Sequence, residues 1–164
     1  MIDIKRKLTA WLNINRGVAN RNDKASIFLW VWGYIVTNQI KGDYIEFGVY
    51  KGNTFIESWR QCLFYRSWVL KQLNSTEKWR RETWSNYSKF RPKFYGIDSF
   101  IGIPENDESD LYFSKGDFAA SKEEVHKRCL NGGMPESQFE LIKSFYSELI
   151  IIICINYQNF FAQI

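Results

Sequence analysis

Residues that bind metals or form disulfides are scarce in this sequence. It contains one histidine and three cysteines, and no two cysteines have the Cys-x-x-Cys spacing. An odd number of cysteines without that spacing argues against a disulfide framework and against a zinc site. We therefore assign no metal site, and we expect a protein of a reducing compartment, the cytoplasm.

Apolar stretches of the kind that enter membranes are missing from the amino-terminal half. The run Ile27–Val36 has ten residues, whereas a membrane-spanning helix needs about 20. Residues Met1–Lys7 are followed by no sustained apolar stretch, so they do not resemble a signal peptide. We expect no membrane partner.

The excess of one charge sign is small. The chain has 22 basic and 18 acidic residues, a net charge of +4. Much of the excess lies in Lys71–Lys93, mixed with aromatic residues, a composition that suits nucleic-acid contact. No nucleic-acid motif accompanies it, so we favour a solvated helix or an insertion, and we expect no nucleic-acid partner.

What the sequence does contain is enough for a folded core. Its 164 residues are 45% hydrophobic, which suits one domain that needs no disulfide or metal. Helices and strands are expected to alternate. Helices are predicted from Asp23 or Ser26 to about Gln39, from Thr54 to about Leu73 and from Ser121 to about Leu130, and strands at Tyr44–Val49, Phe94–Asp98, Phe139–Ile142 and Ile150–Ile155.

This alternation predicts an α/β fold with a mostly parallel sheet. Apolar residues nearly surround the first helix, so it is expected to be buried on most sides, with Trp30 and Trp32 in the core or over a cofactor pocket. The stretch Asn74–Lys93 is either a helical extension or an irregular insertion. Ser121 and Glu124 have the spacing of a capping box at the start of the third helix.

Two features fall where ligands bind in such sheets, beyond the carboxyl ends of the strands. Gly48 allows a turn after the first strand, and Gly52 allows the next helix to begin close to a ligand. The amino terminus of that helix favours a carboxylate or phosphate. Asp98, which ends the second strand, suits a ribose. Both NAD and S-adenosylmethionine (SAM) combine a ribose with an anionic group.

The glycine spacing separates these two cofactors. Dinucleotide-binding loops carry Gly-x-Gly-x-x-Gly, because the pyrophosphate needs two close approaches of the backbone. Here Tyr50 occupies the position of the second glycine. The Gly-x-x-x-Gly spacing, with Glu46 two residues before it, fits the amino-acid end of SAM better. A nucleotide-dependent oxidoreductase is therefore the less favoured alternative.

These motifs resemble the macrocin O-methyltransferase family of class I SAM-dependent enzymes. The resemblance rests on Gly42–Thr54 (GDYIEFGVYKGNT) and Tyr95–Pro104 (YGIDSFIGIP), of which Asp-Ser-Phe-x-Gly-x-Pro is the more distinctive. Lys115–Phe118, Ser121–Val125 and Phe139–Phe145 follow the order of the family. It implies a Rossmann-like methyltransferase domain over residues 25–149, with an insertion at about 73–93, after an amino-terminal segment of residues 1–24.

The resemblance also implies a cofactor site. The amino-acid part of SAM would be surrounded by Glu46, Gly48, Gly52, Asn53 and Thr54, and Tyr50 is a further expected cofactor-binding residue. The ribose would be held by Asp98, with Ser99 and Phe100 near the ribose and adenine, and with Lys143 and Ser144 at the edge of the adenine.

The carboxyl-terminal part departs from the family. Its members continue with an Asp-x-Asp-Leu-Tyr motif and an Asp-Asp pair, which bind Mg²⁺ near the acceptor hydroxyls. Here no acid follows Glu148, and Asn156 is a poorer ligand for a hard cation. We therefore expect a truncated domain with an atypical tail, residues 150–164, that is out of frame or unrelated.

The sequence thus predicts a transferase, a SAM-dependent O-methyltransferase-like protein whose small-molecule acceptor is a sugar or secondary-metabolite hydroxyl. The alternative is a catalytically inactive fragment with residual or no SAM binding. No catalytic residue is assigned. Whether a second copy of the chain completes the sheet in a homo-oligomer is left open.

Overall fold

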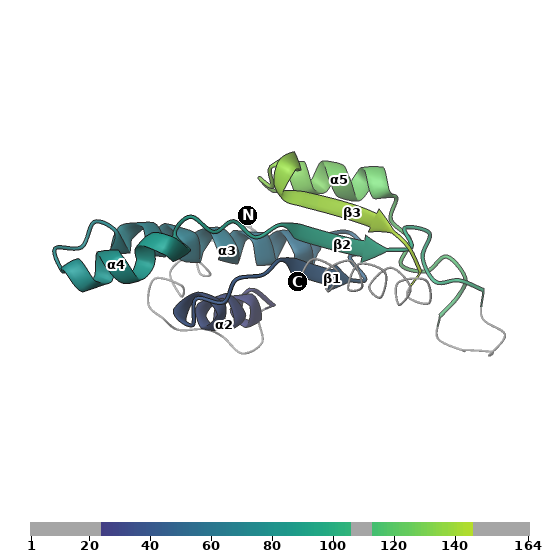
Figure 1. The fold of residues 1–164 in the computed structure, drawn as a ribbon. Helices are drawn as coiled ribbons and strands as arrows, with labels where there is room; N and C mark the ends of the chain where they lie inside the picture. The colour runs from purple at the N-terminus through teal and green to yellow at the C-terminus, as the bar shows by residue number, and fades with distance from the viewer. Residues whose placement is uncertain (1–23, 106–112, 146–164) are drawn as a thin grey trace, which may run out of the picture. The chain divides into compact units, whose positions relative to one another are not determined.

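The computed structural model describes residues 24–105 and 113–145 (Figure 1). Their elements are, in chain order, α2 (Lys24–Thr37), β1 (Tyr44–Phe47), α3 (Asn53–Gln72), α4 (Lys78–Tyr87), β2 (Phe94–Asp98), α5 (Lys122–Asn131), the 3-10 helix η1 (Glu136–Gln138) and β3 (Phe139–Lys143). The strand expected at Ile150–Ile155 and the tail of residues 150–164 lie outside the described residues.

These residues form two compact units. The helical unit contains residues 24–42 and 54–92, and the sheet unit contains residues 43–53, 93–105 and 113–145. Helix α3 begins at Asn53, the last residue of the first sheet segment. The boundaries between the two units lie after Gly42, after the first residue of α3 and after Pro92, within the single domain, 25–149, that the sequence suggests.

The sheet unit contains a three-stranded parallel sheet in the order β1-β2-β3 (Figure 1). Tyr44 pairs with Phe94, which in turn pairs with Phe139. The prediction of an α/β fold with parallel strands is confirmed for the described residues, and the arrangement is compatible with a Rossmann-like fold. Strand β1 ends at Phe47, two residues before the predicted end, because Gly48 has a φ of 76°.

The core of the sheet unit lies between β3 and α5. Val125 and Cys129 of α5 have no exposed surface, and Phe94 of β2 is likewise fully buried. The ring of His126 lies 5.2 Å from that of Phe139. Alternate residues of a strand share a face, so Phe139 and the buried Leu141 point to one side of β3.

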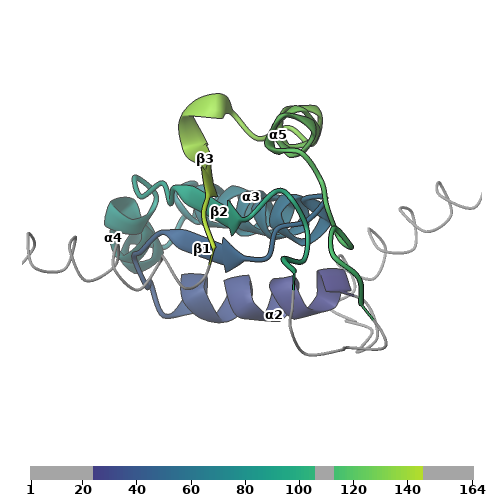
Figure 2. The ribbon, with the colours of Figure 1, turned by 90° about the vertical axis from the view of Figure 1, so that its right-hand side faces the viewer.

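The helical unit consists of α2, α3 and α4 (Figures 1 and 2). The three helices share one cluster of buried side chains. Its buried residues are Val36 of α2, Val69 of α3, and Trp84 and Tyr87 of α4. Helices α2 and α3 approach closely at Gly33, where an added Cβ would lie 2.6 Å from the hydroxyl oxygen of Tyr65. A glycine in the middle of α2, which disfavours helix, is therefore explained by packing.

The prediction that the first helix is buried on most sides is wrong. Trp30 is 68% exposed and Tyr34 is 67% exposed, whereas Trp32 and Val36 are buried. The packing partners of α2 within the helical unit lie on one side, so its other apolar side chains stay uncovered. Trp32 does occupy the core as expected, but Trp30 does not.

The stretch Asn74–Lys93 contains a separate helix, α4, rather than an extension of α3. Arg81 of α4 donates hydrogen bonds to the carbonyl oxygens of Ser75 and Thr76, at 2.6 and 2.9 Å. These contacts fix the turn between the two helices. Among the helices of the described residues, none is long and apolar enough to cross a membrane.

Candidate functional site

A cavity of about 520 Å³ opens within the sheet unit at the carboxyl ends of the strands. Because parallel strands end at the same edge, the loops after β1, β2 and β3 meet there. Small-molecule sites typically have volumes of about 300–1,000 Å³. The cavity is lined by Gly48, Tyr50, Asp98, Ser99, Gly102, Ile103, Pro104, Phe118, Ser144 and Phe145.

The loop after β1 is a tight turn built on two glycines. Gly48 and Gly52 each have a φ of 76°, a conformation that costs glycine little. Gly48 donates its N–H to the carbonyl of Ile97 at 2.9 Å, and Gly52 donates to that of Val49 at 2.8 Å. The first bond ties the turn to β2, and the second closes it before α3.

Asp98 connects this turn to the loop after β2. Its Oδ2 accepts the N–H of Tyr50 at 2.7 Å, and its Oδ1 accepts the N–H of Phe100 at 3.0 Å. Its carbonyl accepts the N–H of Ser144, beyond β3, at 3.0 Å. A carboxylate has about four acceptor positions, so two backbone bonds leave acceptor capacity on each oxygen for the hydroxyls of a ligand.

Backbone strain is concentrated around this carboxylate. Tyr50, Phe100 and Phe118 have positive φ values of 48°, 55° and 59°. For residues other than glycine this conformation is uncommon and costs about 1–3 kcal/mol, and such residues cluster at ligand sites. Tyr50 and Phe100 donate their N–H groups to Asp98, and Phe118 lines the cavity beside it. The strain therefore supports a binding role for this edge.

The loop after β2 forms the floor beside Asp98. Ser99 donates its hydroxyl to the carbonyl of Gly102 at 3.0 Å, and Gly102 has a φ of 82°. The next residue, Ile103, donates its N–H to the carbonyl of Asp117 at 2.9 Å and accepts that of Gly116 at 2.9 Å. These bonds join the two halves of the loop at the cavity.

An aromatic wall faces the turn. The rings of Tyr50 and Phe118 meet edge to face, with centroids 5.7 Å apart. Phe113 adds a third ring, 5.7 Å from that of Phe118. The ammonium of Lys51 lies 5.1 Å from the centroid of the Tyr50 ring. Phe118 remains 53% exposed, so its ring is available to stack on a planar ligand.

The structure brings together five of the residues that the sequence predicts for the cofactor site. These are Gly48, Tyr50, Asp98, Ser99 and Ser144, all of which line the cavity.

The other six predicted residues do not line it. Glu46 accepts a hydrogen bond from the Tyr44 hydroxyl at 2.6 Å. Asn53 accepts one from Arg128 at 2.7 Å. Phe100 is 6% exposed and reaches Asp98 through its N–H.

Gly52 is buried in the turn, and Thr54 is the second residue of α3. Lys143 is exposed at the end of β3, opposite Asp98.

Sequence reasoning missed Phe118, Phe145 and Ile103 as lining residues. Gly102 and Pro104 stood in the recognised motif but were given no role. Phe118 lies far from the glycine turn in sequence, in a loop without periodicity, and its contact with Tyr50 depends on how the loop folds back. The glycines at positions 102 and 116 were the only features of the sequence that indicated that this loop folds back on itself.

The described residues do not fit a magnesium site. Within residues 24–105 and 113–145, no group of three or more His, Cys, Asp or Glu side chains is placed to hold a metal ion. We therefore derive no chemical step through a metal.

Comparisons with known proteins do not extend this description. A scan of the chain against models of protein families finds no match, and a search of curated proteins finds none either.

Proposed function

We propose that the chain binds SAM at the carboxyl edge of its sheet and is a SAM-dependent O-methyltransferase-like protein with a Rossmann-like methyltransferase fold. The observation that carries the cofactor is Asp98, whose two oxygens each accept one backbone N–H and keep acceptor capacity toward a 520 Å³ cavity. A ribose offers two adjacent hydroxyls that suit such a carboxylate.

The backbone N–H and the side chain of Tyr50 both favour SAM over a dinucleotide as the ligand. Its N–H is already donated to Asp98, so it is not directed at a phosphate as the second glycine of a dinucleotide loop would be. Its side chain lines the cavity, where a glycine would leave room for a pyrophosphate. Both features suit a ligand with a ribose and no pyrophosphate.

Neighbouring residues would contact the rest of the ligand. Phe118 offers a ring face for the adenine, and Ser99 and Ser144 offer polar atoms at the cavity wall. Bound SAM would supply an electrophilic methyl group. The assignment of the acceptor, a sugar or secondary-metabolite hydroxyl, rests on the resemblance of Asp98–Pro104 and Gly42–Thr54 to the macrocin O-methyltransferases alone.

Isothermal titration of the 164-residue chain with SAM, and with NAD in parallel, tests this proposal. We expect saturable heat with SAM and none with NAD. Asp98→Ala should abolish the SAM signal, because it removes the ribose acceptor. Glu140→Ala is the matched control, since it removes an exposed carboxylate of β3 whose only described ion pair is with Lys93. Saturable NAD binding without SAM binding contradicts the proposal. The absence of binding heat with both ligands contradicts it as well.

A further inference from the structure

Tyr50 stands in the chain between the groups that suit the two ends of SAM. Its N–H is donated to the carboxylate of Asp98 at 2.7 Å, where the ribose is proposed to bind. Helix α3 begins three residues later, at Asn53, and the amino terminus of a helix favours a carboxylate such as that of the amino-acid end. In SAM, the positively charged sulfonium joins the ribose part to the amino-acid part. The sulfonium is therefore expected beside Tyr50.

The aromatic ring of Tyr50 is accessible to a cation. Tyr50 lines the cavity, and the ring of Phe118 meets its ring edge to face, with an angle of 80° between the two planes. The ammonium nitrogen of Lys51 lies 5.1 Å from the centroid of the Tyr50 ring. This separation is within the distance of about 6 Å at which an aromatic face attracts a cation. The ring thus already has one cationic neighbour within the sheet unit.

The backbone of Tyr50 gives no reason for a tyrosine at this position. Its φ of 48° lies in the left-handed region, which glycine adopts at little cost and other residues adopt rarely. A glycine could donate the same N–H to Asp98. The tyrosine side chain is therefore present at a conformational cost, as is common for residues at ligand sites.

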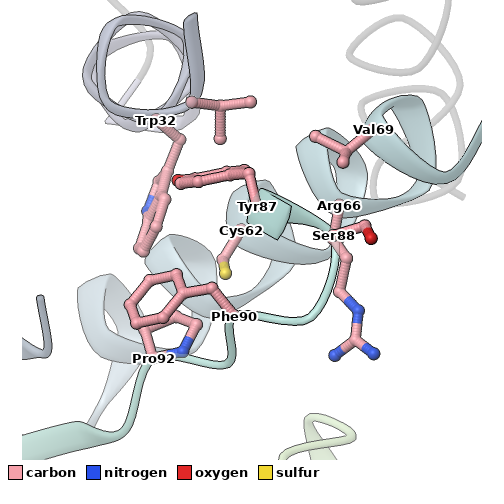
Figure 3. A pocket seen from close by; sticks show the side chains of 9 residues that line it. Trp32, Cys62, Arg66, Val69, Tyr87, Ser88, Phe90 and Pro92 are labelled. Carbon is pink, nitrogen blue, oxygen red and sulfur yellow. The ribbon is translucent and has the colours of Figure 1, made fainter. Parts of the chain in front are cut away.

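A second cavity lined by aromatic rings has no room for such a ligand. In the helical unit, Trp32, Tyr87 and Phe90 point toward one another around a cavity of about 30 Å³ (Figure 3). One water needs about 10–15 Å³ of such space, so this cavity holds roughly two waters. The cavity beside Tyr50, of about 520 Å³, has the volume that a nucleoside needs.

We propose that the ring of Tyr50 contacts the sulfonium of bound SAM by a cation–π interaction. The contact would make the site prefer SAM over S-adenosylhomocysteine, the demethylated form, because the sulfur of that form is uncharged. The ribose contact of Asp98 is common to both ligands and cannot distinguish them. This inference rests on the proposed SAM site and assigns Tyr50 as its specificity residue.

Isothermal titration of the full chain with SAM and with S-adenosylhomocysteine tests the contact. We expect SAM to bind more tightly by about tenfold. Equal affinity of the two ligands, or tighter binding of S-adenosylhomocysteine, overturns the sulfonium contact and leaves the SAM site in place. The absence of binding by both ligands overturns the SAM site and this inference with it.

Variants of Tyr50 separate the charge of the sulfonium from the bulk of its methyl group. Tyr50→Leu keeps an apolar side chain for the methyl group but removes the ring, so the advantage of SAM should fall to about twofold. The affinity for S-adenosylhomocysteine should change little. Tyr50→Phe keeps the ring and should keep the advantage.

Tyr34→Leu is the matched control, because it removes a tyrosine of α2 that is 67% exposed and does not line the cavity. It should leave both affinities unchanged. A full SAM advantage in Tyr50→Leu, shown by thermal unfolding to be folded, contradicts the contact. Loss of the advantage in a folded Tyr50→Phe contradicts it equally.

Discussion

The carboxylate of Asp98 has a structural task as well as the proposed binding task. Asp98→Asn replaces one oxygen with an amide NH₂, which cannot accept from Tyr50 or Phe100. We expect a loss of about 1–3 kcal/mol in the free energy of unfolding, because one donor loses its partner. Urea denaturation measures it. Glu140→Gln should change it little, because its ion pair with Lys93 is exposed to solvent. Equal effects of the two changes would contradict a constrained Asp98.

The two thiols that the structure describes should be unreactive in the folded protein. Burial raises the pKa of Cys62 from 9.0 to about 12 and that of Cys129 from 9.0 to about 11. At pH 8 both are therefore protonated, and only the thiolate reacts. In a Cys154→Ser background, Ellman's reagent should label neither thiol rapidly until denaturant is added. Rapid labelling of the native protein at pH 8 would refute this.

The raised pKa values of these two thiols predict how the stability of the protein depends on pH. Their pKa values are raised in the folded state, so their contribution is complete below about pH 9 and is lost as the pH rises toward 11–12. The free energy of unfolding should therefore fall above pH 9. The fall should be smaller in Cys62→Ala, which can be followed by urea denaturation at several pH values. An unchanged slope in Cys62→Ala would contradict the assignment.

At the residue scale, sequence reasoning succeeded where a local pattern sets the geometry. Asp98 is the last residue of a mostly apolar strand, and Gly48 directly follows another, so both could be placed at the sheet edge from the sequence. The contact between Tyr50 and Phe118 could not be placed, because it depends on two loops that are distant in sequence. The hydrogen bond of Asn53 with Arg128 is likewise invisible to local patterns.

Among the elements, the loop after β2 depends on glycine at two positions for different reasons. Gly102 and Gly116 both have positive φ values, 82° and 86°. A Cβ at Gly102 would lie 2.5 Å from the carbonyl oxygen of Asp117, whereas one at Gly116 would meet nothing within 4 Å. Gly116→Ala should therefore lower the free energy of unfolding by only the cost of placing alanine in the left-handed conformation, about 1–2 kcal/mol. Gly102→Ala should lower it by more, because its Cβ also clashes with the backbone.

Urea denaturation of the two alanine variants checks this order. Because Gly102 also lines the cavity, its variant should lose ligand affinity, while Gly116→Ala should keep it. If Gly116→Ala is the more destabilised of the two, the described loop geometry is wrong.

Helix α5 depends on its amino-terminal cap. The hydroxyl of Ser121 accepts the N–H of Glu124 at 3.1 Å, which confirms half of the predicted capping box. Ser121→Ala should lower the free energy of unfolding by about 1 kcal/mol. Ser137→Ala, at an exposed position in η1, is the control and should change it little. Equal melting temperatures of Ser121→Ala and the unaltered protein would refute the role of the cap.

Helices and strands were predicted best where residues that typically end such elements mark their bounds. Strand Phe94–Asp98 has the predicted bounds, and α5 ends at Asn131, before two glycines. The exposure of α2 was mispredicted, because an apolar composition does not show how many neighbours a helix has. Helix α4 was left open as an alternative, since Lys78–Tyr87 has few apolar residues to mark a helical face.

Across the whole molecule, the parallel sheet followed from the alternation of helices and strands, but the two compact units did not. The boundaries at Gly42, Asn53 and Pro92 depend on contacts between distant parts of the chain. Charge also differs between the units. Residues 54–92 hold eight basic and three acidic residues, a net charge of +5, against +4 for the entire chain. Residues 24–42 of the same unit add two basic residues and no acidic one, for a net charge of +7, whereas the described residues of the sheet unit have a net charge of −2. The helical unit is therefore basic, and the sheet unit is close to neutral.

The most direct test of the central claim is a map of backbone amide chemical shifts as SAM is added to the isotope-labelled protein. We predict saturable shifts, largest at the amides that meet Asp98, namely those of Tyr50, Phe100 and Ser144. Asp98→Ala should remove them. The absence of shifts, or shifts confined to residues 54–92, would contradict a SAM site at the edge of the sheet.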